Sequence, residues 1–211
     1  MKNRQSSAAP EALGRRSFLR LGAGLALAVP FAAAAAGCST DDPLAEQANA
    51  GDNKNYIAGD GSVTEYDPAD RGDAVQFTAE LFDGTKVASA DWAGDVVVLN
   101  FWYAACAPCR KEAPDLVELH NTFEAQGARF YGVNIRDEKA TAEAFERNFS
   151  IPYPSFRDKD GGVLLAMTNF VPPQAVPTTL VLDREGRVAA RILGLADKGT
   201  LKALISDALA A

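Results

Sequence analysis

The feature that most constrains the fold is a nearly continuous apolar run, Val96 to Tyr103, that is soon followed by Cys106-Ala107-Pro108-Cys109. Such a run is expected for a central strand that is covered on both faces. Residues 107–126 have the pattern of a helix, so the cysteine pair falls where a buried strand passes into a helix. Cys106 would cap this helix, and Pro108 would lie in its first turn, where the N–H that proline lacks is not needed.

Strand and helix patterns alternate through the remainder of residues 75–211. Asp83-Gly84 separates two short strand-like stretches and predicts a β-hairpin. Further strands are predicted at 129–135, 154–157, 178–182 and 187–193, and further helices around 142–149, 163–170 and 201–209. This order predicts an α/β fold with a mixed central sheet, helices on both faces and an N-terminal β-hairpin.

The first 37 residues differ in charge from the rest of the chain. They contain five basic residues and one acid, and an uncharged run from Leu21 to Gly37 follows Arg15-Arg16. A basic start, a short apolar core and a small-residue end are typical of a secretory signal. The paired arginines resemble a twin-arginine signal, and Sec export is the alternative.

Ala35-Ala36-Gly37-Cys38 resembles a bacterial lipobox, in which the cysteine is lipidated. Cys38 is therefore the predicted lipidation site, which would hold the protein at a membrane surface; a free or buried thiol is the alternative. Residues 38–74 are acidic and poor in large apolar side chains, so we expect a flexible tether between anchor and domain. A short extended patch, at Tyr56–Ile57 or at Val63–Tyr66, could pack on the domain.

Composition excludes several classes of function. The net charge is −7, with 21 Lys and Arg against 28 Asp and Glu, which argues against nucleic acid as a partner. Three cysteines and one histidine are too few for a disulfide scaffold or a Cys/His zinc site, so no metal is expected. The chain has no glycine-rich phosphate loop in the predicted domain, and no cofactor is expected beyond the cysteine pair itself.

Dithiol chemistry is the interpretation of Cys106 and Cys109 that we favour. Unpaired N–H groups at a helix start stabilise a thiolate at the first cysteine, and the second cysteine, one turn on, suits the role of resolving thiol. A structural disulfide here would close only a four-residue loop and would stabilise little. A zinc half-site lacks two ligands, and attachment of haem would require His where Arg110 stands.

Residues 101–114, FWYAACAPCRKEAP, resemble the active-site segment of thioredoxin-fold proteins, and most closely that of the ResA/TlpA group of extracytoplasmic thiol-disulfide oxidoreductases. Val176-Pro177-Thr178-Thr179 resembles the second signature of that group, a cis-proline loop opposite the cysteines. The resemblance implies that Val176 and Pro177 bind an extended substrate segment; an ordinary trans proline at the start of an edge strand is the alternative for Pro177. Trp102 and Pro108 are further candidates for substrate contact, and a core position is an equal alternative for Trp102. Ala105 replaces the tryptophan of thioredoxins, which is expected to open the surface around Cys106.

Glu112 is the third predicted catalytic residue. It shares one helix face with Cys109, Leu116 and Leu119, so a carboxylate lies on an otherwise apolar stripe. Burial would raise its pKa and let it exchange a proton with Cys109, whereas an exposed acid would only stabilise the helix start. Asn100 stands where cytoplasmic thioredoxins have Asp; it is either part of the site or a satisfied core amide.

The resemblance implies a lipid-anchored oxidoreductase on the extracytoplasmic face of a bacterial cell membrane. Its expected partners are protein disulfides or dithiols, including apocytochrome c during cytochrome c maturation, and a membrane dithiol electron donor of the CcdA type. An oxidase that forms disulfides in exported proteins is the main alternative. A thiol peroxidase and a lipoprotein binding module with a vestigial cysteine pair are minor alternatives.

Overall fold

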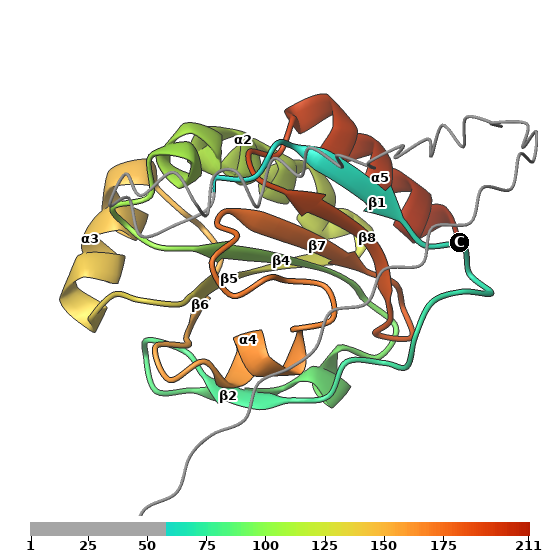
Figure 1. Cartoon of the computed structure of the whole chain (residues 1–211), viewed down its shortest axis with the longest axis horizontal. Helices are drawn as coiled ribbons and strands as arrows, with labels where there is room; N and C mark the ends of the chain where they lie inside the picture. The colour runs from blue at the N-terminus through green and yellow to red at the C-terminus, as the bar shows by residue number, and fades with distance from the viewer. Residues whose placement is uncertain (1–57) are drawn as a thin grey trace, which may run out of the picture. The chain divides into compact units, whose positions relative to one another are not determined.

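A six-stranded mixed sheet forms the centre of the computed structural model, which describes residues 58–211 (Figure 1). Its strands β4, β5 and β6 are parallel, whereas the β1–β8, β8–β7 and β7–β4 pairs are antiparallel. In spatial order the strands are β1 (Ser62–Glu65), β8 (Val188–Leu193), β7 (Thr178–Leu182), β4 (Val96–Trp102), β5 (Ala128–Asn134) and β6 (Ser155–Arg157). The predicted mixed sheet is confirmed.

Strand β4 lies inside the sheet and is buried along all seven residues, as its apolar sequence predicts. Val96 and Val98 belong to the core on one face of the sheet. Val97, Leu99 and Phe101 belong to the core on the other face. Burial on both faces accounts for the apolar sequence of the strand, and its one polar residue, Asn100, has side-chain partners in Glu112 and Thr179.

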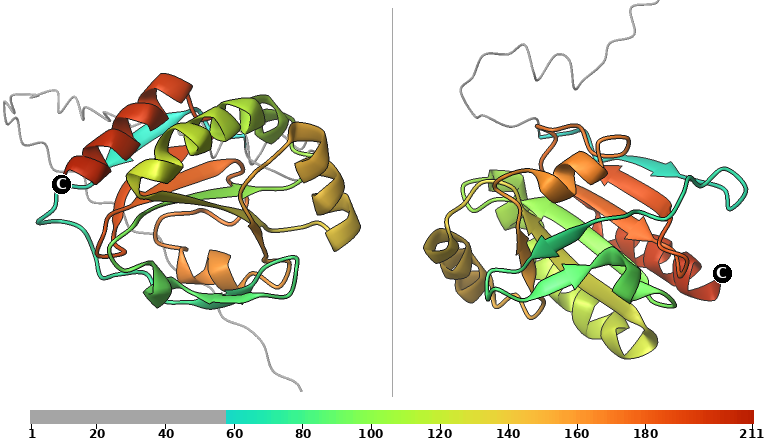
Figure 2. Two further views of the ribbon diagram at one scale, coloured as in Figure 1. Left: turned by 180° about the vertical axis from the view of Figure 1, so that it is seen from behind. Right: turned by 90° about the horizontal axis from the view of Figure 1, so that it is seen from below.

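Three helices cover one face of the sheet: α2 (Ala107–Phe123), α3 (Lys139–Phe149) and α5 (Lys198–Ala210). The β4–α2–β5 and β5–α3–β6 connections step along the sheet in the same direction, and right-handed crossovers place both helices on the same side. Helix α5 lies beside α2, as the views of Figure 2 show. A 3-10 turn, η2 (Glu124–Gln126), continues α2 before β5 begins.

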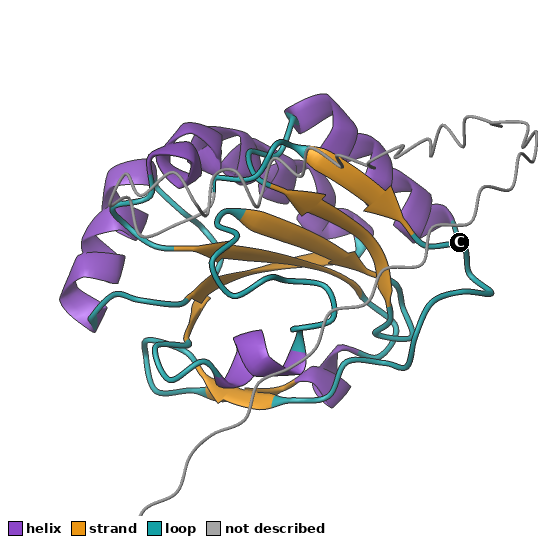
Figure 3. Ribbon diagram, viewed as in Figure 1, coloured by secondary structure: helices purple, strands orange, loops and turns teal. Residues whose placement is uncertain are grey.

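The opposite face is covered by α4 (Gly162–Ala166), the hairpin of β2 (Thr78–Glu80) and β3 (Lys86–Ala88), and the 3-10 turn η1 (Ser89–Trp92) (Figure 3). The hairpin is where Asp83-Gly84 predicts it. Helices on both faces are therefore confirmed. Across residues 58–211, the structure contains no helix that is both long and apolar enough to span a membrane.

The folded domain begins earlier than the boundary predicted at residue 75. Ser62–Glu65 forms edge strand β1 and pairs antiparallel with β8, from Ser62 opposite Leu193 to Glu65 opposite Ala190. The prediction of a flexible tether through residue 74 is thus wrong for the part from 58 onward. The patch predicted at Val63–Tyr66 does pack on the domain, and it does so through backbone pairing to a sheet edge, which needs no apolar composition. The predicted signal, Cys38 and residues 38–57 lie outside the described residues.

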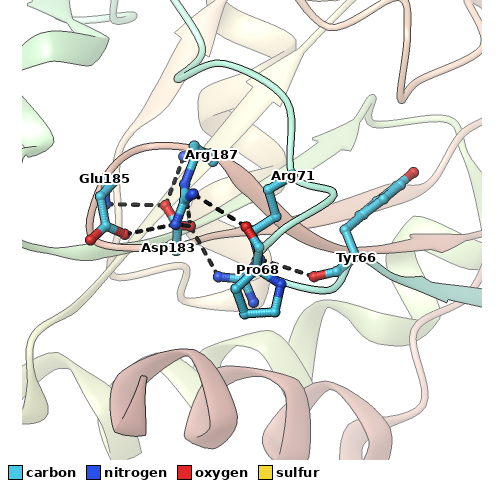
Figure 4. A network of polar contacts seen from close by, with 6 residues as sticks. All are labelled: Tyr66, Pro68, Arg71, Asp183, Glu185 and Arg187. Atoms are coloured by element: carbon cyan, nitrogen blue, oxygen red, sulfur yellow. Dashed lines mark hydrogen bonds and ion pairs between the residues drawn. The ribbon is translucent and has the colours of Figure 1, made fainter.

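A polar network fixes the next part of this N-terminal segment to the turn between β7 and β8 (Figure 4). The carboxylate of Asp183, 2 % exposed, accepts bonds from Arg71 Nη1 at 3.0 Å and Arg187 Nε at 2.9 Å. It also accepts the backbone N–H groups of Glu185 and Arg187. Arg71 in turn donates to the carbonyl of Tyr66. One buried carboxylate therefore holds both the turn and the incoming chain.

We expect Asp183→Asn to lower the free energy of unfolding at pH 7 by about 2 kcal/mol or more, because two guanidinium groups lose their charged acceptor. Burial alone would raise the pKa of Asp183, but the bonds from Arg187 and Arg71 outweigh it and hold the pKa below 3.8. The stabilisation is present above the ordinary pKa and is lost as the pH falls through the native value.

Urea denaturation at pH 7 and in acid measures this effect. In Asp183→Asn the free energy of unfolding should also fall less steeply as the pH is lowered. Glu185→Gln is the matched control, since its carboxylate pairs with Arg187 but is 67 % exposed. It should change stability by less than about 0.5 kcal/mol. Equal losses in the two variants would contradict the assignment.

Candidate active site

The cysteine pair lies at the start of α2, directly after β4. Cys106 is the N-cap residue, with φ −72° and ψ 110°, and its sulfur accepts the backbone N–H of Cys109 at 3.2 Å. Pro108 lies in the first turn, as predicted, and is half-buried. The helix start therefore directs an N–H group and the positive end of its dipole at the Cys106 sulfur, which favours a thiolate there.

The two sulfurs are joined in a disulfide, with the Cα atoms 5.3 Å apart. Cys106 has no exposed surface and Cys109 is 2 % exposed. Phe82, Tyr103 and Val176 belong to the apolar cluster around them. The expectation that Ala105 opens the surface around Cys106 is therefore wrong for the disulfide form, because neighbouring side chains other than residue 105 enclose the sulfur.

The segment between β4 and the cysteines is held by Asp137, which the sequence reasoning missed. Its Oδ2 accepts the backbone N–H of Ala104 at 2.6 Å and Nδ2 of Asn134 at 2.8 Å. Asn134 is the last residue of β5, which is parallel to β4. The residues that follow the two strands therefore lie at the same edge of the sheet. The signal that points to it is a pair of polar residues at the end of the strand predicted at 129–135: Asn134 in its last two residues and Asp137 two residues after it.

The Val176–Pro177 peptide bond is cis, and the loop that contains it lies against the cysteine pair. The carbonyl oxygen of Val176 is 3.9 Å from the Cys106 sulfur. The hydroxyl of Thr178 donates to the carbonyl of Ala175 at 2.7 Å, which closes the loop on itself. The backbone N–H of Gly194 donates to the carbonyl of Pro177 at 2.8 Å. The structure thus brings the two sequence signatures together.

Glu112 is buried, with 1 % exposure, on the face of α2 that carries Cys109 one turn earlier. Its Oε1 accepts Nδ2 of Asn100 at 2.7 Å, and its Oε2 accepts the backbone N–H of Ala196 at 2.9 Å. Burial raises the pKa of Glu112 to about 7; the bonds from Ala196 and Asn100 oppose this rise, and nearby Asp115 adds to it. A carboxyl with this pKa can accept or release a proton near neutral pH.

Asn100 connects Glu112 to the cis-proline loop. Its Nδ2 also donates to Oγ1 of Thr179, at 3.1 Å, two residues after Pro177. The side chain is 5 % exposed and is satisfied on both sides, so it is a core amide that at the same time positions a site residue. The N–H of Ala196 was not foreseen, since a backbone donor leaves no mark in the sequence. Thr179 belongs to the second sequence signature, but its bond to Asn100 is a long-range contact that the signature does not reveal.

Trp102 is a core residue. It is 4 % exposed, and its ring lies 4.3 Å from that of Phe145, centroid to centroid. With Cys109, Tyr153 and Ser155 it lines a cavity of about 10 Å³. This position does not support the predicted contact with a protein substrate. It makes Trp102 part of the apolar wall that separates Cys109 from solvent.

These residues form the parts of a dithiol–disulfide exchange centre. A sulfur at a helix start has the environment of a nucleophile, an enclosed second sulfur one turn on has that of a resolving group, and a buried carboxyl on the same helix face has a pKa suited to proton exchange. The sequence segment from 71 to 191, which holds all three, matches the model of the AhpC/TSA family. The chain belongs to the AhpC/TSA family.

Within this family the chain resembles proteins named for dithiol chemistry. It is 33 % identical to the thiol-disulfide oxidoreductase ResA of Bacillus subtilis, over 58 % of this chain and 66 % of the relative. It is also 33 % identical to ResA of Geobacillus thermodenitrificans, over 61 % of this chain and 72 % of the relative. The matched segment thus spans about two thirds of these relatives.

A solved structure supports the same assignment. The secreted thiol-disulfide isomerase of Corynebacterium glutamicum aligns with a TM-score of 0.64 and 29 % identity, over 72 % of this chain and 95 % of that one. The fold is thioredoxin-like, and this AhpC/TSA member is a thiol-disulfide oxidoreductase that exchanges dithiol and disulfide through Cys106 and Cys109.

We expect Glu112→Gln to slow resolution at Cys109 by about 10²-fold at neutral pH, because the group that takes its proton is lost. In the natural chain the rate should rise as the pH passes about 7, where Glu112 becomes a base; this limb should vanish in the variant. Stopped-flow kinetics of a peptide disulfide from pH 5 to 9 measures it. Glu118→Gln, an exposed acid on the same helix, should leave the profile unchanged.

Cys109→Ala should accumulate a mixed disulfide with a substrate protein through Cys106, whereas Cys106→Ala should form none. The reason is that only the sulfur at the helix start is stabilised as a thiolate by the Cys109 N–H group. Non-reducing gels with mass spectrometry identify the linked cysteine. Trapping through Cys109 in the Cys106→Ala variant would reverse the assigned roles.

Proposed function

We propose that this oxidoreductase reduces disulfides in exported proteins at the outer face of a bacterial cell membrane. The observation that carries the proposal is the buried Glu112, which stands one helical turn from the enclosed Cys109 with a pKa near 7. This carboxyl can serve as the base that turns the resolving thiol into a nucleophile, and as the acid in the reverse reaction, so it supports exchange chemistry in either direction. The resemblance to the ResA/TlpA group favours the reducing direction.

The proposed reaction moves two electrons from the cysteine pair to the substrate. The Cys106 thiolate attacks one sulfur of a substrate disulfide, and the other substrate sulfur leaves as a thiolate that takes up a proton. Glu112 then accepts the proton of Cys109, whose sulfur attacks Cys106 and releases the second substrate thiol. The protein is left with the Cys106–Cys109 disulfide, and a dithiol donor must reduce it again.

Recognition of the substrate is assigned to the cis-proline loop. The backbone of residues 176–177 is expected to pair with an extended substrate segment beside Cys106, as an added strand, once the side chains that bury both residues move aside. Val176 already places its carbonyl oxygen 3.9 Å from the sulfur. Pro108, half-buried in the first turn of α2, completes the proposed contact surface.

The proposed substrates are apocytochrome c cysteine pairs, kept reduced for haem attachment, and the proposed electron donor is a membrane dithiol protein of the CcdA type. We further propose that the chain is exported and held at the membrane through a lipid on Cys38. The name of the Corynebacterium glutamicum relative, a secreted protein, supports export.

Formation or rearrangement of disulfides in exported proteins is the second candidate. It is favoured by the same relative, which is named an isomerase. Both directions use the same two sulfurs, and the reduction potential of the Cys106–Cys109 pair separates them. Reductants have reduction potentials of about −270 mV, the value of thioredoxin, and strong oxidants of about −120 mV.

We expect a reduction potential closer to about −270 mV than to about −120 mV when the Cys106–Cys109 pair is equilibrated with glutathione or dithiothreitol buffers.

Deletion of the gene should abolish c-type cytochromes, and added dithiothreitol should restore them. Complementation with Cys106→Ala should fail, and Cys38→Ala should move the protein out of the membrane fraction. Normal cytochromes together with reduced, misfolded exported proteins would instead establish the oxidase.

A further inference from the structure

The first described residues, Ala58 to Gly61, pack directly on the loop that follows β8. The N–H of Gly61 donates to the carbonyl of Leu193 at 2.7 Å. A Cβ atom on Gly194 would lie 2.6 Å from the carbonyl oxygen of Ala58, and one on Gly59 would lie 2.5 Å from the nitrogen of Gly194. The two backbones therefore touch, with no space for a side chain on either glycine.

The same loop, residues 194–197, carries two bonds to the active site on its other side. The N–H of Gly194 donates to the carbonyl of Pro177 at 2.8 Å, and the N–H of Ala196 donates to Oε2 of Glu112 at 2.9 Å. Asp197 then caps α5 through the N–H of Thr200. A displacement of this loop would move donors to the cis-proline loop and to Glu112 together.

We propose that the segment Ala58–Gly61 and Gly194 are positioning elements of the active site, which hold loop 194–197 against Glu112 and Pro177. The chain that leads into the domain is thus part of the support of the exchange centre. The proposal concerns the position of these groups, and only its consequence for catalysis rests on the role proposed for Glu112.

The carboxyl of Glu112 is a sensitive reporter of the loop position. It is buried, and the bonds from Ala196 and Asn100 are the two that offset its burial. The other titratable groups that face it are Asp115 on its own helix and Tyr153 in the segment before β6. Loss of the Ala196 bond removes one stabilising donor from the charged form, so the pKa of Glu112 rises.

The glycines provide matched variants. Gly194→Ala and Gly59→Ala each insert a Cβ into the opposing backbone, at φ +94° and +69°. Gly127→Ala and Gly161→Ala impose the same backbone strain, at φ +93° and +75°, where a Cβ would meet nothing within 4 Å. Asp60→Ala is a milder variant, because it only removes the acceptor of the Ser62 N–H and inserts no atom.

The experiment is a carboxyl titration by NMR of the full-length chain labelled with ¹³C-glutamate, with the Glu112 signal assigned by Glu112→Gln. We expect Gly194→Ala and Gly59→Ala to raise the pKa of Glu112 by about one, and Asp60→Ala to raise it by less. Gly127→Ala and Gly161→Ala should lose similar thermal stability but leave this pKa unchanged. The KM for a disulfide peptide should rise in the first pair alone.

An unchanged Glu112 pKa in Gly59→Ala and Asp60→Ala, or an equal rise in the Gly127→Ala and Gly161→Ala controls, would overturn the proposal. If Gly194→Ala does not fold, Gly59→Ala and Asp60→Ala decide, since they leave the loop sequence intact. The titration reads the carboxyl itself. If Glu112→Gln exchanged disulfides at the normal rate, the catalytic role proposed for Glu112 would be refuted, but the pKa shifts measured in the glycine variants would still stand.

Discussion

The backbone N–H of Cys109 that reaches the Cys106 sulfur is the interaction on which the rest of the site depends. It exists because a seven-residue buried strand ends close to the start of a helix, and the sulfur occupies the capping position. The strand is fixed by apolar cores on both faces, so the helix start cannot drift. The folded structure thereby holds the Cys106 sulfur at the helix start, where its thiolate form is stabilised.

A second constraint is the burial of a carboxyl that has polar partners on both of its oxygens. Asn100 comes from the centre of the sheet and Ala196 from the loop after β8, while Glu112 itself is on α2. Three separate parts of the chain must fold correctly before this acid has a pKa near 7. The raised pKa of Glu112 is therefore a property of the tertiary structure, even though Glu112 and Cys109 share one helix.

The sequence predicts the parts of this molecule whose signal is local. The apolar run of β4, the helix periodicity that places Glu112 with Cys109, and Pro108 in the first turn all depend on neighbouring residues, and the structure has them where they are expected. The Asp83-Gly84 hairpin belongs to the same group. Periodicity and turn chemistry carry this information because they act within one element.

What the sequence does not reveal is carried by backbone groups and by long-range contacts. Strand β1 pairs through main-chain bonds, so the sequence points to a contact at Val63–Tyr66 but gives neither the strand nor its partner β8. The N–H of Ala196 has no sequence signature at all. Trp102 and Ala105 were misjudged because solvent exposure depends on Phe82, Phe145 and Val176, which lie far away in the sequence.

The enclosure of Cys106 also limits which molecules can react with the oxidised protein. Attack on a disulfide requires a thiolate to approach along the sulfur–sulfur axis, and the burial of Cys106 slows this approach by a small diffusing thiol. A partner that binds long enough to part the covering side chains reacts faster. The burial of Cys106 thus favours reaction with a bound partner over reaction with other thiols, and this preference does not depend on their reduction potentials.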